Sequence, residues 1–234
     1  MTIARSISVV LPVYRNRPHL PELHRRLTET LRPLASIYEL VFVDDAAGDG
    51  AVEWLRECRT RDDRVVLVEM AQNSGQHKAV LAGLGRSTGD VVIVMDADLQ
   101  DAPEDIERLV DALNRNGGVV FARRTERHQS QGRHVTGRLF KRLLRRLAGS
   151  RVPAGTGMFF AATRAVVDAA LPRAADARYV PLLLDETGAP MTAIDILKSH
   201  RVDTQSAYSA RRRLQLALGA IRQAIAWRLA RKPR

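Results

Sequence analysis

Residues 91–100 read VVIVMDADLQ, and this stretch decides the fold. Five apolar residues, four of them β-branched, end at an acidic pair, Asp96 and Asp98. A short apolar run of this kind is typical of a strand that is buried on both faces. The following residues, Pro103 and Glu104, are typical of a helix start, because proline fits the first turn and acids favour the positive end of the helix dipole. The stretch therefore predicts a buried strand, an acidic loop and a helix.

Other parts of the first 123 residues repeat this arrangement. Similar apolar runs occupy residues 7–13 (ISVVLPV), 39–44 (ELVFVD), 64–69 (RVVLVE) and 118–122 (GVVFA). Segments with helical spacing lie around residues 20–34, 51–59, 76–87 and 103–116. Strands that alternate with helices predict an α/β fold, a mostly parallel sheet flanked by helices, with ligands at the carboxyl ends of the strands. Beyond residue 123 the alternation weakens.

Size and composition favour a folded protein of the cytoplasm. The chain has 234 residues, of which 45% are hydrophobic, enough for one large core. The single cysteine, Cys58, excludes an intramolecular disulfide and fits a reducing compartment. Neither a secretory signal pattern nor an apolar run of membrane-spanning length is evident. We therefore expect a cytoplasmic location.

Positive charge is concentrated in two segments. The chain carries a net charge of +11; residues 123–151 hold ten Lys or Arg against one acid, and residues 206–234 hold eight against none. Residues 136–148 and 209–231 read as basic amphipathic helices, which either cover the sheet or lie on an anionic membrane surface. Nucleic-acid binding on an inactive fold is the weaker alternative, since no nucleic-acid motif accompanies the arginines and aromatic residues make up only 5%.

The acidic pair predicts a metal site. A period of two lets Asp96 and Asp98 point to the same side of the strand end, where their carboxylates would repel each other without a cation. Mg²⁺ or Mn²⁺ takes one or two carboxylates and leaves its other positions to water and phosphates. Gln100 can add a carbonyl oxygen. We predict that Asp96, Asp98 and Gln100 hold a diphosphate through this ion. The alternative is that these acids form an ordinary loop, in which Asp101, Glu104 and Asp105 serve the next helix.

Two other strand ends carry candidate ligands for a nucleotide. Asp44 and Asp45 end a strand, where a carboxylate can accept hydrogen bonds from a base or a ribose. The turn that follows them is equally consistent with a simple loop. Tyr14, after the first strand, could stack on a base, although this residue alone says little.

The order of the motifs resembles a known family. The succession VVLPVYRN (9–16), VFVDDAAGDG (41–50), NSGQHKAVLAGL (73–84), VVIVMDADLQDAPE (91–104) and VVFARRTER (119–127) resembles family 2 glycosyltransferases with the GT-A (Rossmann-like) fold. Within that family it resembles the polyprenyl-phosphate (dolichyl or undecaprenyl) enzymes, and the resemblance covers nearly the whole chain. Late in the chain, SAYS at 206–209 resembles the family's S-K-Y-S.

The resemblance implies roles for individual residues. The implied substrate-binding residues are Pro12, Tyr14, Asn16, Asp44, Asp45, Asn73, Gly75, Lys78, Asp96, Ala97, Ser206 and Tyr208. The implied catalytic residues are Asp98, Gln100, Arg124 and Arg127, in which the arginines neutralise phosphate charge. The implied reaction is a metal-dependent, inverting transfer of a sugar from a nucleotide diphosphate sugar, UDP favoured over GDP, to a polyprenyl phosphate. Such an acceptor is already an anion and needs no general base.

The acceptor side departs from the family pattern. Ala207 replaces the lysine of S-K-Y-S, Gly155 stands where the family tends to have aspartate, and Phe159 stands where many members have arginine. Related enzymes end in membrane spans, and we expect none in this sequence. Two alternatives stay open: peripheral attachment to the inner face of the membrane with a polyprenyl phosphate acceptor, or a soluble acceptor. We expect a GT-A domain over residues 1–205 and a basic amphipathic helix over 206–234.

Overall fold

The computed structural model describes residues 4–125, 149–177 and 179–197. The predicted basic helices at 136–148 and 209–231, and the expected boundary after residue 205, lie outside these ranges. The same holds for Arg127, Ser206 and Tyr208. Among the described helices, none combines the length and the apolar character that crossing a membrane requires.

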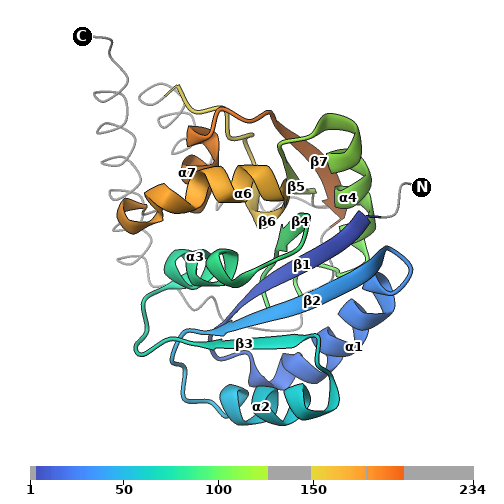
Figure 1. The fold of residues 1–234 in the computed structure, drawn as a ribbon, viewed down its shortest axis with the longest axis vertical. Coiled ribbons are helices and arrows are strands. Elements are labelled where there is room, and N and C mark those ends of the chain that lie inside the picture. Colours follow the sequence, from blue (N-terminus) through green and yellow to red (C-terminus); the bar gives the residue numbers. More distant parts are fainter. Residues whose placement is uncertain (1–3, 126–148, 178, 198–234) are drawn as a thin grey trace.

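The described residues form one seven-stranded sheet (Figure 1). Its strands are β1 (Ala4–Val13), β2 (Ala35–Asp44), β3 (Val65–Glu69), β4 (Val91–Val94), β5 (Val119–Thr125), β6 (Thr156–Thr163) and β7 (Met191–Leu197). They lie in the order β3-β2-β1-β4-β6-β5-β7. Strand β6 is antiparallel to its neighbours β4 and β5, and every other pair is parallel. Six strands therefore share one direction.

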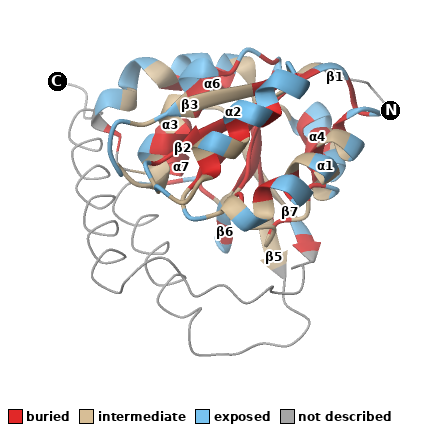
Figure 2. Cartoon of the chain, turned by 90° about the horizontal axis from the view of Figure 1, so that it is seen from below, coloured by how far each residue is buried: buried red, intermediate tan, exposed pale blue. Residues whose placement is uncertain are grey.

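Helices cover both faces of this sheet (Figure 1). They are α1 (Leu20–Leu31), α2 (Ala51–Arg61), α3 (Gln76–Arg86), α4 (Asp105–Asn116), α6 (Arg164–Ala170) and α7 (Val180–Glu186), with 3-10 turns η1 (Arg17–His19) and η2 (Leu171–Asp176). Helices α1, α2 and α4 share one core, and α3, α6 and α7 share the other. In β1, Val9 and Leu11 face the first core while Val10 faces the second, and all three are fully buried. Figure 2 shows the buried strands between helices whose outer surfaces are exposed.

The prediction of a mostly parallel α/β sheet is confirmed, but two strands were not predicted. Strand β6 reads TGMFFAAT and β7 reads MTAIDIL, and their small and polar residues weaken the strand pattern. Both form because they pair with neighbours that are distant in sequence, and such pairing outweighs intrinsic strand propensity. Strand β4 ends at Val94, two residues before the strand end that the sequence predicts at Asp96, and α4 begins two residues after Pro103. Differences of this size are usual at element ends.

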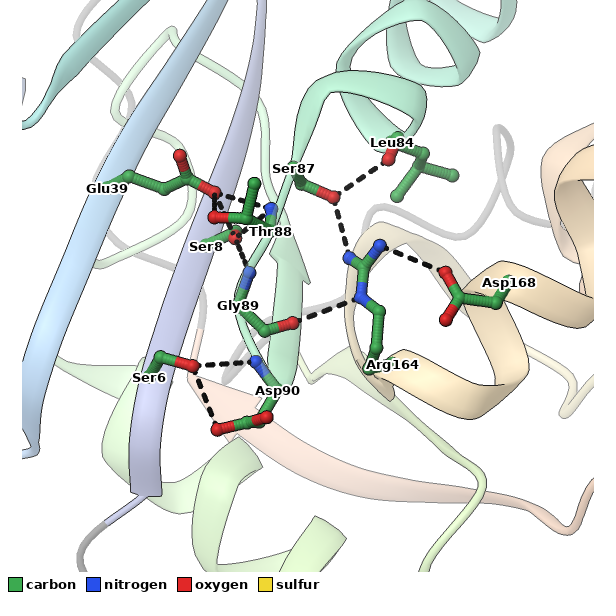
Figure 3. Close-up of polar contacts among 10 residues, drawn as sticks. All are labelled: Ser6, Ser8, Glu39, Leu84, Ser87, Thr88, Gly89, Asp90, Arg164 and Asp168. Carbon is green, nitrogen blue, oxygen red and sulfur yellow. Dashed lines mark hydrogen bonds and ion pairs between the residues drawn. The ribbon is translucent and has the colours of Figure 1, made fainter.

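A polar network ties β4 to β1 at the amino edge of the sheet (Figure 3). The buried Ser8 hydroxyl donates to Glu39 at 2.6 Å and accepts the N–H of Gly89 at 2.7 Å. Arg164 donates to the carbonyl of Gly89 at 3.1 Å and to the hydroxyl of Ser87 at 2.7 Å. A Cβ atom at position 89 would lie 2.6 Å from the backbone nitrogen of Ser8, so only glycine fits there. The network fixes the start of the strand that leads into the acidic pair.

Candidate active site

The carboxyl ends of β1, β2 and β4 lie at one edge of the sheet because these strands are parallel. The N–H of Asp45 donates to the carbonyl of Val13 at 2.9 Å, and the N–H of Met95 donates to the carbonyl of Val10 at 3.2 Å. Strand β5 runs in the same direction and brings Arg124 to this edge. All the predicted site residues that the structure describes lie at or next to this edge: Pro12, Tyr14, Asn16, Asp44, Asp45, Asn73, Gly75, Lys78, Asp96, Ala97, Asp98, Gln100 and Arg124.

Backbone strain is concentrated in the three loops at this edge. Arg15, Ala46 and Leu99 have φ angles of 60°, 53° and 59°, in the left-handed region that favours glycine. Among the described residues no other non-glycine side chain stands at positive φ. Each of the three follows the end of a different strand, β1, β2 or β4. Strain of this kind clusters at functional sites, where the surroundings hold a loop in a required shape.

The loop after β4 carries the acidic pair. Ala97 is buried in the first core and anchors the loop, while Asp96 and Asp98 are only partly buried. The left-handed turn at Leu99 lets the N–H of Gln100 donate to Asp98 Oδ1 at 3.0 Å. Gln100 thus contacts Asp98 through its backbone and is itself half-buried. The buried Ala97 thus fixes the loop that carries the two carboxylates.

Asp96 is the most perturbed of these carboxylates. Its side chain keeps 29% exposure, Gln76 donates a side-chain N–H to Oδ1, and Arg124 Nη2 lies 4.0 Å from Oδ2. Burial, together with the negative charges of Asp101 and Asp98, raises the pKa of Asp96 to about 7. A cation between the carboxylates would relieve this repulsion. The donor set therefore fits a hard divalent ion.

The protein alone would not complete the coordination of such an ion. Across residues 4–125, 149–177 and 179–197, no group of three or more His, Cys, Asp or Glu side chains could hold a metal. Mg²⁺ and Mn²⁺ commonly use one or two carboxylates and fill the other positions with water and substrate phosphates. The pair of carboxylates is consistent with that mode of binding.

Arg124 is held by a carboxylate that sequence reasoning did not assign to the site. Its Nε and Nη2 donate to the two oxygens of Asp101 at 2.7 and 2.6 Å, and the Asp101 side chain is fully buried. Although burial opposes the charge of Arg124, the Asp101 contacts raise the arginine pKa above its usual value. In the alternative interpretation of the sequence Asp101 only serves the next helix, but in the structure it forms this ion pair across to β5. The guanidinium faces both Asp101 and Asp96.

Asp44 and Asp45 differ in what their oxygens contact. Both oxygens of Asp45 accept backbone N–H groups, from Ser74 at 2.6 Å and Gly75 at 2.8 Å. Asp44 Oδ2 accepts the N–H of Ala46 at 3.0 Å, whereas Oδ1 is buried and has no hydrogen-bond partner among the described residues. Burial raises the pKa of Asp44. Because buried acceptors are almost always paired, Oδ1 is suited to an N–H group of a ligand.

The remaining predicted residues surround these carboxylates. Asn16 Oδ1 accepts the N–H of Tyr14 at 2.9 Å, and the guanidinium of Arg15 lies 5.3 Å from the centre of the Tyr14 ring. Pro12 is buried in β1, so it shapes the strand end. Lys78 is exposed in the first turn of α3. Lys78 and Asn73 are thus the exposed residues of this group, and Tyr14 and Asn16 are partly buried.

Comparison with known proteins assigns the family. A family model described as "Glycosyl transferase family 2" matches residues 8–171, which include the strand ends described above. The chain belongs to glycosyl transferase family 2. This membership agrees with the order of motifs in the sequence and with the GT-A fold of the sheet.

One curated relative in family 2 is similar over most of the chain. The undecaprenyl-phosphate 4-deoxy-4-formamido-L-arabinose transferase of Pseudomonas fluorescens is 36% identical over 211 residues. The alignment covers 90% of the present chain and 62% of that relative. The family 2 chain described here thus spans less than two thirds of the length of this relative.

Two solved structures show the same fold at low identity. A mannosyltransferase from Pyrobaculum calidifontis, in complex with GDP-Man and Mn²⁺, has a TM-score of 0.64 at 20% identity, covering 97% of this chain and 65% of its own. Glucosyl-3-phosphoglycerate synthase from Mycobacterium tuberculosis, in complex with Mn²⁺, UDP and phosphoglyceric acid, has a TM-score of 0.58 at 20% identity, covering 97% and 78%. At this identity the likeness supports the fold alone.

Two residues of this family 2 site were missed by sequence reasoning. Gln76 follows Gly75 at the start of α3 and contacts Asp96; its place beside a predicted substrate-binding glycine could have indicated it. Asp101 could not be found in the same way, because its partner Arg124 lies 23 residues away in the chain. Only the pairing of β5 in the sheet brings those two side chains together.

Proposed function

We propose that the chain transfers a sugar from a nucleotide diphosphate sugar to a polyprenyl phosphate in a metal-dependent reaction. The observation that carries the proposal is the acidic pair Asp96 and Asp98 at the end of β4, with Arg124 4.0 Å from Asp96. At the end of β2 on the same edge, Asp44 Oδ1 is buried and has no partner among the described residues. Family membership supports glycosyl transfer. The relative that acts on undecaprenyl phosphate, by its name, supports the acceptor class.

The residues at the edge of the sheet take distinct parts in this reaction. Asp44 Oδ1 accepts an N–H of the base, for which we favour uracil over guanine, and Tyr14 covers the base. Asp96, Asp98 and Gln100 hold Mg²⁺ or Mn²⁺, which supplies charge neutralisation to the diphosphate when bound. Arg124, with Arg127 outside the described residues, adds positive charge on the leaving-group side.

The acceptor determines the chemistry. A phosphate oxygen of the polyprenyl phosphate attacks the anomeric carbon, the bond from that carbon to the donor diphosphate breaks, and the nucleoside diphosphate leaves with the electron pair. The acceptor is an anion at neutral pH, so no side chain has to remove a proton. A single displacement inverts the anomeric configuration. We place the enzyme on the cytoplasmic side, with its basic segments against an anionic membrane surface.

A soluble acceptor is the second candidate, favoured by one observation. Phe159, which stands where many members of the family have an arginine, is fully buried in the first core, so it offers no charge to an acceptor phosphate. If the acceptor is a soluble hydroxyl compound, a base would also be required.

Donor turnover with two acceptor pools tests the proposal. Labelled UDP-sugars and GDP-sugars are incubated with the protein and Mn²⁺, with undecaprenyl phosphate in vesicles or with a soluble extract. We expect sugar transfer in the vesicles, and we expect EDTA to abolish it. Asp96→Asn or Asp98→Asn should reduce the transfer rate by at least about a hundredfold, which is the size expected for the loss of a charged catalytic contact. Transfer only to soluble material would favour the second acceptor class, and transfer insensitive to EDTA would refute the metal dependence.

A further inference from the structure

Arg124 lies between two carboxylates at unequal distances. Asp101 Oδ1 and Oδ2 accept from Nε and Nη2 at 2.7 and 2.6 Å, whereas Asp96 Oδ2 lies 4.0 Å from Nη2. The first is a two-point contact that fixes the plane of the guanidinium. The second is at the outer limit of an ion pair. The same nitrogen, Nη2, therefore faces both acids and is bonded to one.

Burial makes the contact with Asp101 the stronger of the two. The Asp101 side chain has 0% exposure, while Asp96 keeps 29%. A charge-assisted fork in a site shielded from water is held more firmly than a single long contact that water can screen. Without Asp101, the nearest described carboxylate for this guanidinium is Asp96.

We propose that Asp101 is a positioning residue that holds Arg124 back from Asp96 and so keeps the Asp96 carboxylate open to a divalent cation. The inference rests on the proposed function, in which Asp96 and Asp98 bind the metal. It assigns different roles to the acids: the buried Asp101 neutralises the arginine, and the partly buried Asp96 and Asp98 remain for the ion. Arg124 can then lie beside the bound cation without taking its place at the Asp96 carboxylate.

Loss of the Asp101 charge should have opposite effects on metal and on nucleotide. In Asp101→Asn the guanidinium is free to close on Asp96, where it competes with the cation and repels it. Because the site has also lost one negative charge, it repels a diphosphate less, with or without a metal. The affinity for UDP should therefore depend less on Mn²⁺ in the variant than in the wild type, an effect that general destabilisation of the fold would not produce.

The measurement is UDP binding by calorimetry with Mn²⁺ and with EDTA, supplemented by the electron paramagnetic resonance signal of free Mn²⁺. We expect the ratio of the two UDP affinities to fall about tenfold in Asp101→Asn, and the Mn²⁺ concentration for half-saturation to rise by about the same factor. Asp62→Asn is the matched control. Arg64 donates Nε and Nη2 to Asp62 at 2.6 and 2.9 Å in the same fork, and Asp62 lies before β3, at the opposite edge of the sheet.

Three outcomes would overturn the inference. An unchanged ratio in folded Asp101→Asn would show that Asp101 does not hold Arg124 back. No binding of UDP or GDP with Mn²⁺ by the wild type would remove the proposed function, and this inference with it. If the single variant does not fold, the double variant Asp101→Asn with Arg124→Gln removes both charges and avoids an unpaired buried ion. Its ratio should not fall below that of the wild type, since no guanidinium remains to close on Asp96; a tenfold fall would refute the inference.

Discussion

The carboxylate of Asp45 accepts the backbone N–H of Gly75 at 2.8 Å, which fixes the end of β2 to the start of α3. Its other oxygen accepts the N–H of Ser74 at 2.6 Å. The next residue along the chain, Gln76, donates its side-chain N–H to Asp96. One short loop thus joins the carboxylate expected to serve the nucleotide to the carboxylate expected to serve the metal.

Replacing Asp45 should loosen this loop. In Asp45→Asn one side-chain oxygen becomes an NH₂ group, which leaves a backbone N–H of the loop without its acceptor. Hydrogen bonds to charged groups contribute about 1.5–3 kcal/mol, so the free energy of unfolding should fall by about that amount. Urea unfolding and hydrogen exchange at Ser74 and Gly75 would measure the two effects. Asp49→Asn is the control: it loses one of two backbone contacts, from the N–H of Arg17 at 3.1 Å or of Ala51 at 3.2 Å, and should leave exchange at Ser74 and Gly75 unchanged. Equal exchange in both variants would contradict the assignment.

How far the sequence could predict this site depends on how local each contact is. The acidic turn at Asp98 and Gln100 lies within one loop, and the position of that loop after a buried run was readable from the sequence. The pairs Asp101 with Arg124 and Asp45 with Gly75 join segments that meet only in the folded sheet. The parallel strands could be predicted from the apolar runs in the sequence. Strand β6 could not be predicted in this way, because its pairing with β4 and β5 decides its conformation.

The strained residue Ala46 offers a test of the loop after β2. Its φ of 53° costs an alanine about 1–2 kcal/mol relative to glycine, and the residue is exposed. Ala46→Gly should relieve that strain, partly offset by the greater freedom of glycine in the unfolded chain, and so raise the free energy of unfolding by up to about 1 kcal/mol. The neighbouring Ala47→Gly, which is not at positive φ, should instead lower it by about 0.5–1 kcal/mol. Thermal and urea unfolding of the two variants would show whether the signs differ, and a stability loss in both would refute the strained conformation.

Two glycines in α3 should respond oppositely to alanine. A Cβ atom at Gly83 would overlap Val10 Cγ1 and lie 2.9 Å from Val43 Cγ2, whereas at Gly85 the nearest atom is Leu171 Cδ2 at 3.9 Å. Gly83→Ala should therefore cost about 1–3 kcal/mol through overpacking of the helix on β1 and β2. Gly85→Ala, on the exposed side, should gain up to about 1 kcal/mol from helix propensity. Urea unfolding measures both, and a stable Gly83→Ala variant would mean that α3 does not pack this closely on the sheet.

His77 should make stability depend on pH. Burial lowers the pKa of His77 from its ordinary 6.5 to about 4, and its Nδ1 accepts the N–H of Val180 at 3.4 Å, a contact that requires the neutral ring. The unfolded chain takes up a proton near pH 6.5 and the folded chain only near pH 4, so stability from the neutral ring is complete above pH 6.5 and is lost as pH falls toward 4. At about 1.36 kcal/mol per pKa unit the loss reaches at most about 3 kcal/mol. Urea unfolding of wild type and His77→Gln between pH 7.5 and 4.5 should show the wild type losing more stability than the variant on acidification. Parallel pH profiles would contradict a neutral, partly buried ring.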